Sequence, residues 1–422
     1  MMKYNTARWG VVMSTFSKDP FKYHFEKLED VADRISEVLS CPITIEDVNH
    51  RLLAYSSHDD CTDQARISTI IGRRVPEKVI NSLWKDGTIP KLMEQDEPVR
   101  VGHIDQVGLG NRVAISIRKD QEVLGFIWAL EINKSLDAEE LQLLKKAAQA
   151  VKNKILNLQV RKIKKDERNQ EFFWKLLTGH LESQQEIKES FEQFHVKEPA
   201  LFTIILFQFP EKIKDTEEKQ INYLLQTTQQ VHILLSTIDY DKLIILVDLK
   251  GEQPLAKLKE FSSAVISQLQ ERFFIKGASA AIGGIYTNPV LVAKSYREAL
   301  STFKIKERFP NETNGLIHFS ELGIYQYLDL LHKQRQEDEY VNWQLMRLKE
   351  YDLDHHTNLV ETLEVLLDHD SNVHSAAKAL NVHVNTLNYR MKRIGEIAEI
   401  NLKNTNEKLT IYLDLKLYKL SL

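Results

Sequence analysis

A cluster of polar and basic side chains between residues 385 and 393 offers the chemistry needed to read double-stranded DNA. Amides and hydroxyls can hydrogen-bond to base edges, and cationic side chains bind phosphates. The residues that could make these contacts are Asn385, Thr386, Asn388, Tyr389, Arg390, Lys392 and Arg393. The solvated face of an ordinary helical bundle would carry similar side chains, so the elements that hold the cluster must be considered next.

The spacing of apolar residues around this cluster predicts two short helices that meet at a tight turn. Leu387, Met391 and Ile394 are four and three residues apart, as on one face of a helix. With that stripe facing inward, the side chains that point outward are Asn385, Tyr389, Lys392 and Arg393. Asn372 is a suitable N-cap for the preceding alanine-containing helix, and residues 381–383 form the expected turn. The pattern indicates a helix-turn-helix that further helices must complete.

The string VHVNTLNYRMKRIGEI, residues 382–397, resembles the signature that ends the PucR/CdaR-type bacterial transcriptional regulators. Residues 319–331, FSELGIYQYLDLL, form an expected amphipathic helix capped by Ser320 and are similar to the start of the same domain. The resemblance implies an all-α helix-turn-helix domain over residues 315–422, with operator DNA as its partner. Val384 and Asn388 stand where the family pattern usually has arginine, so two cations near the DNA are absent.

Composition and charge limit how the chain could bind nucleic acid. At 422 residues the chain is too long for one compact core, which predicts several domains. The net charge of -4 excludes a uniformly basic nucleic-acid coat, so a DNA contact must come from a local patch. Residues 371–422 carry eight lysines and arginines against four acids, whereas residues 352–370 carry six acids and no lysine or arginine. This charge step fits a module whose far end meets phosphates.

The cysteine count and the hydropathy pattern predict a cytoplasmic protein. Cys41 and Cys61 are the two cysteines of the chain, and they imply no disulfide framework. No apolar run reaches the roughly 18 residues of a membrane-spanning helix, so no membrane partner is expected.

Residues 21–135 predict an α+β domain with helices on one side of a sheet. A helical pattern covers residues 25–39, and strand-like runs lie at 43–45, 52–55, 112–117 and 123–130, the last two forming a hairpin. This layout resembles a GAF-type sensory domain, which implies a small-molecule effector held between the sheet and its helices. The candidate ligand-binding residues are Tyr55, Arg100, His103, Arg112 and Trp128. Trp128 also suits a core and the arginines a surface, although a guanidinium matches the carboxylate of an amino acid or a similar effector.

Residues 136–190 predict a helical linker with a coiled-coil-like pattern. Apolar residues recur at intervals of three and four, at Leu141, Leu144, Ala148, Val151, Ile155 and Leu158. We expect a parallel two-stranded coil that joins two copies into a homodimer. The alternative is an amphipathic helix that packs on its own sensory sheet.

Residues 195–312 predict an α/β domain in which strand-like and helical patterns alternate. The stretch ASAAIGGIYTNPVLVAKSYREALSTFKI, residues 278–305, resembles the middle domain of the same regulators, a degenerate relative of GGDEF-type cyclase folds. Gly283 and Gly284 lead into Ile-Tyr-Thr, without the acidic residues that would hold magnesium for phosphoryl transfer. The positions expected in helix packing or interfaces are Ser295, Tyr296, Arg297 and Ala299.

Together these patterns predict a multidomain α+β protein with a GAF-like sensory domain, a helical linker, a degenerate GGDEF-like domain and a helix-turn-helix domain. The expected function is a ligand-responsive, DNA-binding transcriptional regulator that activates a catabolic gene or operon. We expect no enzyme activity, no cofactor and no metal, since the histidines at 369, 374 and 383 lack further ligands at zinc spacing. The alternative is a catalytically inactive, cyclase-like scaffold that binds a nucleotide or a protein.

Overall fold

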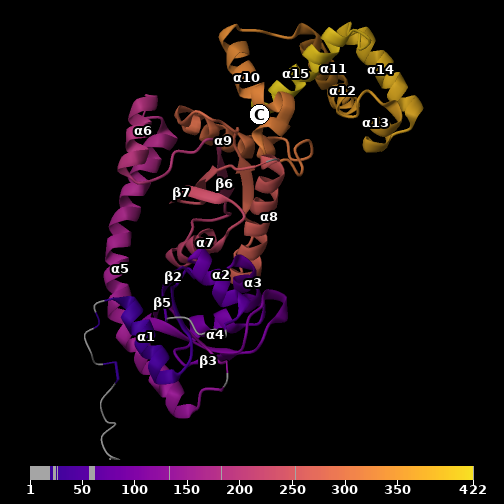
Figure 1. Cartoon of the computed structure of the whole chain (residues 1–422). Helices are drawn as coiled ribbons and strands as arrows, with labels where there is room; N and C mark the ends of the chain where they lie inside the picture. Colours follow the sequence, from indigo (N-terminus) through magenta and orange to yellow (C-terminus); the bar gives the residue numbers. More distant parts are fainter. Residues whose placement is uncertain are drawn as a thin grey trace, which may run out of the picture. The chain divides into compact units, whose positions relative to one another are not determined.

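The computed structural model describes residues 20–21, 25, 27–56, 62–132, 134–181, 183–251 and 253–421, with the backbone alone at 157–168 and 421 (Figure 1). The chain forms two compact units, Met1–Ala280 with Ile285–Ala293 and Ala281–Gly284 with Lys294–Leu422. None of the described helices is long and apolar enough to cross a membrane.

A five-stranded antiparallel sheet organises the N-terminal domain. Its strands are β1 (Ile43–Asp47), β2 (Leu52–Tyr55), β3 (Val99–Val101), β4 (Arg112–Lys119) and β5 (Glu122–Leu130), in the order β2-β1-β5-β4-β3. The predicted hairpin is confirmed, because β4 pairs with β5 along its whole length, from Arg112 opposite Leu130 to Lys119 opposite Glu122. The central strands are buried on both faces, which requires a covering layer on each side.

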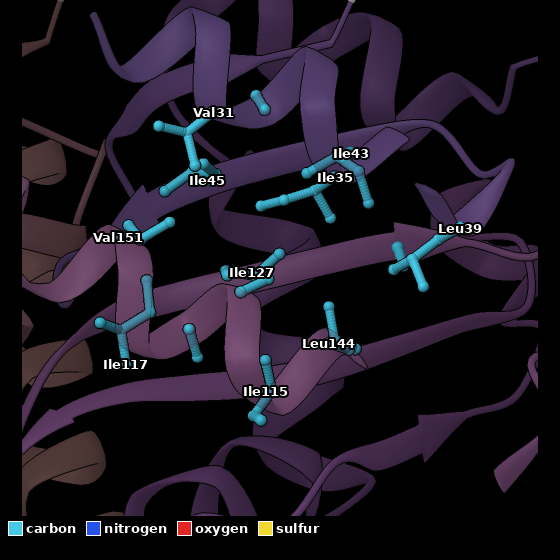
Figure 2. Close-up of a cluster of buried hydrophobic side chains, with 14 of the residues drawn as sticks. Val31, Ile35, Leu39, Ile43, Ile45, Ile115, Ile117, Ile127, Leu144 and Val151 are labelled. Carbon is cyan, nitrogen blue, oxygen red and sulfur yellow. The ribbon is translucent and has the colours of Figure 1, made fainter. Parts of the chain in front are cut away.

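Helices cover both faces of this sheet, so the prediction of helices on one side was wrong. On one face lie α1 (Leu28–Leu39) and α5 (Ala138–Thr178), and on the other lie α2 (Gln64–Gly72), α3 (Glu77–Lys85), α4 (Thr88–Glu94) and the short 3-10 helix η1 (Asp105–Val107). Figure 2 shows the first layer, where Ile115 and Ile127 meet Val31 and Leu144. Phe126 and Trp128 alternate with Ile127 along β5 and point into the second layer.

The apolar stripe of α5 packs on its own sheet, which is the alternative to a coiled coil. Leu144, Ala148, Val151 and Ile155 are all buried in the core that α5 shares with α1 and the sheet, and Leu144 and Val151 are visible there in Figure 2. These side chains therefore cannot also form the seam of a two-stranded coil. The side chain of Leu158 lies outside the described residues.

A four-stranded sheet organises the middle domain. The strands β6 (Phe202–Gln208), β7 (His232–Asp239), β8 (Lys242–Asp248) and β9 (Ser279–Ile282) run in the order β7-β8-β6-β9. The helices that precede or separate them are α6 (Gln184–Gln193), α7 (Asp215–Thr227) and α8 (Pro254–Phe273). The predicted alternation of strands and helices is found here.

The glycine pair of the middle domain serves close packing in the second compact unit. A short 3-10 helix, η2 (Pro289–Leu291), leads into α9 (Val292–Arg308). A Cβ at Gly283 would lie 2.0 Å from the carbonyl oxygen of Ser295, so a side chain cannot fit at this position. Ser295 and Ala299 are buried, as expected of packing positions, whereas Arg297 is exposed.

The C-terminal module is a helical bundle. Its elements are a 3-10 segment η3 (Phe319–Tyr327), α10 (Leu328–Glu337), α11 (Trp343–His355), α12 (Leu359–Asp368), α13 (Val373–Ala379), α14 (Val384–Ala398) and α15 (Thr405–Ser421). The expected single helix over residues 319–331 was wrong, because Gly323 adopts a positive φ of 55° and kinks the chain within η3, and α10 begins only at Leu328. His318, and not Ser320, caps the start of η3. Helices α11, α12, α14 and α15 share one apolar core.

Candidate nucleic-acid interface and buried polar cavity

The helix-turn-helix is built from α13 and α14, and polar side chains close both helix starts. Asn372 accepts hydrogen bonds from the backbone N–H groups of His374 and Ser375, at 3.0 and 3.1 Å, which confirms it as the N-cap of α13. His383 caps α14 through its Nδ1 atom, which accepts the N–H of Asn385 at 3.2 Å. The predicted turn at residues 381–383 therefore lies between the two helices.

The inner face of α14 is fixed by apolar packing. Leu387 and Ile394 are fully buried, and Met391 is half-buried between them, as the spacing predicted. Leu387 packs with Ala376 and Ala377 of α13, whereas Ile394 belongs to the core of α11, α12 and α15. Both apolar clusters pack against the same side of α14, so its opposite side faces solvent.

The outer face of α14 presents a polar, aromatic and basic surface to solvent. Five of the predicted DNA-binding residues are exposed here: Asn385, Thr386, Asn388, Tyr389 and Lys392. The Tyr389 side chain is 69% exposed, which is high for an aromatic residue. This face offers amide, hydroxyl and phenol groups for base edges and an ammonium group for phosphate.

The two remaining predicted DNA-binding residues are half-buried and tied to neighbouring helices. Arg390 donates a hydrogen bond to the hydroxyl of Thr362 on α12 at 3.1 Å. Arg393 donates to the hydroxyl of Tyr351 on α11 from Nε at 3.3 Å and from Nη2 at 3.2 Å, and to Glu396 at 3.0 Å. The hydrogen bonds to Tyr351 and Glu396 raise the pKa of Arg393. Periodicity placed Arg393 on the outer face, but its length allows the guanidinium to fold back onto Tyr351.

A second candidate site is a small cavity of about 10 Å³ between the N-terminal sheet and α2 and α3, roughly the room of one water molecule. Its apolar wall is formed by Ala65, Val75, Val79, Leu83 and Leu109. Its polar wall is formed by Thr44, Glu46, Arg66, Thr69, Arg112 and Trp128. Two guanidinium groups and one carboxylate thus line one buried space.

The two arginines of the cavity are held in different ways. Arg112 pairs with Asp63, whose carboxylate also accepts the N–H groups of Gly110 and Arg66, each at 2.7 Å. Arg66 donates instead to the carbonyl oxygens of Ile43 at 2.8 Å and Ser56 at 3.1 Å. Burial lowers the pKa of Arg66 to about 10, and burial also lowers the pKa of Arg112. A guanidinium held mainly by carbonyl groups has a strong electrostatic reason to bind an anionic ligand.

The structure brings together only two of the five predicted ligand-binding residues. Arg112 and Trp128 line the cavity. Arg100 pairs with Glu131 at 2.8 Å, His103 lies 2.7 Å from Asp105, and Tyr55 is half-buried beside Arg73, all away from the cavity wall. The prediction for these three positions rested on residue type, and residue type does not tell where a side chain points.

Sequence reasoning missed two charged residues of the cavity wall. Glu46 and Arg66 are 3% and 4% exposed. A signal existed for each: Glu46 directly follows the strand-like run at residues 43–45, and Arg66 lies in a helix between Ala65 and Thr69, which face inward.

Other groups that could carry chemistry have structural partners. Among the described residues, one group of carboxylates is close enough to share a cation, namely Glu312, Glu364 and Asp368. The ammonium of Lys416 donates a hydrogen bond to each of the three, at 2.9 to 3.0 Å. Burial raises the pKa of the Cys41 thiol to about 11, so it is protonated and unreactive, and Cys61 lies outside the described residues.

Two family models match the chain at the regions described above. The PucR C-terminal helix-turn-helix domain matches residues 359–417, which span α12 to α15. The GGDEF-like domain matches residues 178–305, which span the middle domain. The first match covers every predicted DNA-binding residue.

Curated relatives extend the similarity along the whole chain. The DNA-binding transcriptional activator AdeR of Bacillus subtilis is 56% identical over 422 residues, all of both chains. The proline-responsive transcriptional activator PutR of the same organism is 30% identical over 94% of this chain and 98% of its own. The carbohydrate diacid regulator of Escherichia coli is 31% identical over 39% of each chain.

Among solved structures, a regulator of polyketide synthase expression from Bifidobacterium adolescentis matches 60% of this chain and 91% of its own, with 17% identity and a TM-score of 0.31. At this score the match does not establish a shared arrangement. The full-length identity to two activators and the matched C-terminal domain are decisive. The chain belongs to the PucR-type family of DNA-binding transcriptional activators that includes AdeR and PutR.

Proposed function

We propose that this protein activates a catabolic gene or operon by binding operator DNA through the outer face of α14, in response to a small-molecule effector. The observation that carries the proposal is the exposed face of Asn385, Thr386, Asn388, Tyr389 and Lys392 within a PucR-type helix-turn-helix. The relatives named as activators support the sign of regulation. The cytoplasm is the compartment in which such a protein meets DNA.

In this proposal α14 lies in the major groove. Asn385 and Thr386 are in its first turn, where the recognition helix of a helix-turn-helix contacts base edges. Asn388 and Tyr389 continue the same face, and Lys392 lies one turn further, where it can reach a phosphate. Arg390 and Arg393 are held by Thr362 and Tyr351 at the rim of this face, which suits contacts to the DNA backbone.

The effector in this proposal binds in the cavity of the N-terminal domain. Two arginines and one glutamate suit a small amino acid, because its carboxylate can pair with a guanidinium and its ammonium with the carboxylate of Glu46. PutR is named as proline-responsive, which agrees with an effector of this class. A cavity of about 10 Å³ cannot hold an amino acid, so binding must move α2 or α3 away from the sheet.

The proposal also includes a homodimer and a middle domain without catalytic activity. A helix-turn-helix commonly reads two half-sites one helical turn of DNA apart, and two copies supply the two heads. For the middle domain, tight packing of Gly283 on Ser295 supports a structural role for the glycine pair.

The DNA-binding part is tested by gel shift and by the salt dependence of affinity on the operator. We expect Lys392→Ala to weaken binding and to lower the slope of log K against log salt by about 1, because one phosphate contact is lost. Tyr389→Ala should weaken binding by about 1 to 3 kcal/mol without changing that slope, since the lost contact is with a base.

Lys333→Ala is the matched control, because Lys333 is an exposed lysine of α10 outside the helix-turn-helix. Unchanged affinity in both α14 variants would exclude this face as the DNA interface.

The effector part is tested by thermal shift of the full chain with a panel of common L-amino acids. We expect at least one to raise the melting temperature of the wild type and of Arg100→Gln, whose arginine lies away from the cavity. The same ligand should not stabilise Arg66→Gln, because this variant lacks the buried guanidinium that binds the carboxylate of the ligand. Equal shifts in all three proteins would place the effector elsewhere.

A further inference from the structure

Glu46 lines the cavity of the N-terminal domain. It is also the first residue of a series of hydrogen bonds that reaches the middle domain. Its side chain is buried, and Oε2 accepts two hydrogen bonds, from Trp128 Nε1 at 3.0 Å and from His50 Nδ1 at 3.2 Å. A buried carboxylate with two donors is strongly held, and a new donor in the cavity would compete for it.

His50 continues the link away from the cavity. The imidazole is fully buried and stacks on Phe126, with ring centroids 5.1 Å apart and planes 8° from parallel. Its second nitrogen, Nε2, lies 3.0 Å from the hydroxyl of Tyr223. Because both ring nitrogens have one partner each, rotation of the ring would break two hydrogen bonds together.

The directions of these hydrogen bonds form one consistent series. Trp84 Nε1 can only donate, so the Tyr223 hydroxyl accepts it at 2.9 Å and can donate its own proton to His50 Nε2. His50 then carries its proton on Nδ1 and donates to Glu46. The tautomer of His50 is thus assigned from its partners.

Tyr223 belongs to α7 of the middle domain, which lies in the same compact unit as the N-terminal domain. Residues at the end of α7 and just after it also contact the N-terminal domain. Gln226 accepts a hydrogen bond from Arg51 at 2.5 Å, and the N–H of Gln229 donates to Glu77 at 2.6 Å. The series from Glu46 to Tyr223 is the buried centre of this interface.

We propose that Glu46 binds the ammonium group of an amino-acid effector and that His50 transmits this event to Tyr223, which changes the seating of α7 on the N-terminal domain. This inference rests on the proposed effector site. An ammonium forms a charge-assisted hydrogen bond to a carboxylate, so it competes with His50 Nδ1 for Glu46 and displaces it. Once released, the imidazole no longer holds the Tyr223 hydroxyl, and Arg66 binds the effector's carboxylate at the other end of the cavity.

Hydrogen–deuterium exchange of the full chain tests the link without any ligand. Glu46→Gln keeps the shape of the side chain and removes its charge, which weakens the bond to His50. We expect it to speed the exchange of amides in residues 215–227 several-fold. Thr44→Val changes another wall residue outside this series and should leave α7 unchanged. If α7 exchanges alike in wild type and Glu46→Gln, the link is refuted.

A second arm uses Tyr223→Phe, which keeps the ring and removes the hydroxyl, with the L-amino acid that stabilises the wild type in thermal shift. We expect this variant to retain the thermal shift but to lose both the ligand-dependent change in α7 exchange and most activation of a reporter gene. Retained activation would overturn the proposal.

The two arms separate this inference from the proposed effector itself. If no L-amino acid stabilises the wild type, the ammonium site fails together with the proposed effector class. The exchange of α7 in Glu46→Gln still decides whether Glu46 and Tyr223 are coupled.

Discussion

Lys416 is a buried cation of the C-terminal module that pairs with three carboxylates. It is 0% exposed, and its ammonium contacts Glu364 and Asp368 of α12 and Glu312 of the segment after α9. Burial lowers the pKa of Lys416, but the hydrogen bonds to Asp368 and Glu364 outweigh burial and raise it above its ordinary value. One cation therefore joins α15 to two other parts of the bundle.

Replacing Lys416 by methionine should destabilise the module by about 3 to 5 kcal/mol, because three carboxylates would face one another without their cation. Urea unfolding of the full chain, followed by circular dichroism, measures the loss. Lys419→Met is the control, since Lys419 is 39% exposed and pairs with Glu364 at 2.6 Å, and should cost at most about 1 kcal/mol. Similar losses in the two variants would contradict the central role of Lys416.

The same cluster predicts a loss of stability in acid. Burial raises the pKa of Glu312, but the hydrogen bond from Lys416, a backbone hydrogen bond and the charges of Lys416 and Lys419 together hold the pKa below its ordinary value. A carboxylate with a depressed folded-state pKa stabilises the fold above its unfolded pKa, about 4.3, and this contribution disappears as the pH falls through the folded pKa. Unfolding free energies measured across this range should fall less steeply in Glu312→Gln than in wild type. Parallel curves would show that Glu312 contributes nothing.

At the scale of elements, the turn between α13 and α14 sets the angle between these two helices. Asn381 has a positive φ of 54°, a conformation that asparagine and glycine tolerate better than other residues. The backbone N–H of Val382 then bonds to the carbonyl of Ala377 at 3.0 Å and closes the end of α13. The turn is thus fixed by one residue in the left-handed region.

Asn381→Val should destabilise the module by about 1 to 2 kcal/mol, because a β-branched residue is strained at this φ. Asn381→Gly keeps the conformation accessible and should stay within a few tenths of a kcal/mol of wild type. Thermal unfolding and operator affinity of both variants check this. A stable Asn381→Val protein would show that the turn can adopt another conformation.

At the scale of the whole molecule, α5 is a 41-residue helix that begins in the N-terminal core. Its apolar stripe from Leu144 to Ile155 is buried against the N-terminal sheet, so a dimer must use other surfaces. Ile155→Lys should therefore lower the free energy of unfolding by roughly 4 kcal/mol, since it buries an unpaired charge. The loss is measured as a lower melting temperature of the full chain.

Asn153→Lys, on the exposed side of the same helix, is the control for Ile155→Lys and should behave as wild type. Sedimentation of both proteins reports the oligomeric state in the same samples. A stably folded Ile155→Lys protein that only loses its dimeric state would restore the coiled-coil hypothesis.

The sequence by itself determined the elements whose causes are local. Period-two and period-3.6 patterns predicted the β4–β5 hairpin, α1, α5 and the two helices of the helix-turn-helix, because burial of one face dictates those spacings. They also predicted the inward and outward faces of α14, except that Arg393 folds back onto Tyr351. The helix α7 escaped prediction, since its contacts with the N-terminal domain, through Tyr223 and Gln226, come from residues far away in the chain.

Tertiary structure alone decided which partners the long side chains and the apolar face of α5 contact. The apolar residues of α5 suit a coiled coil or packing on a sheet equally well. In the structure they pack on the apolar face of the N-terminal sheet, which α5 covers together with α1. Lys416 and Lys419 count toward the positive charge of residues 371–422, yet they neutralise the acids of α12 and lie among them. The polar cavity joins Glu46, Arg66 and Arg112 from three separate segments, and a pattern along one chain does not encode such a meeting.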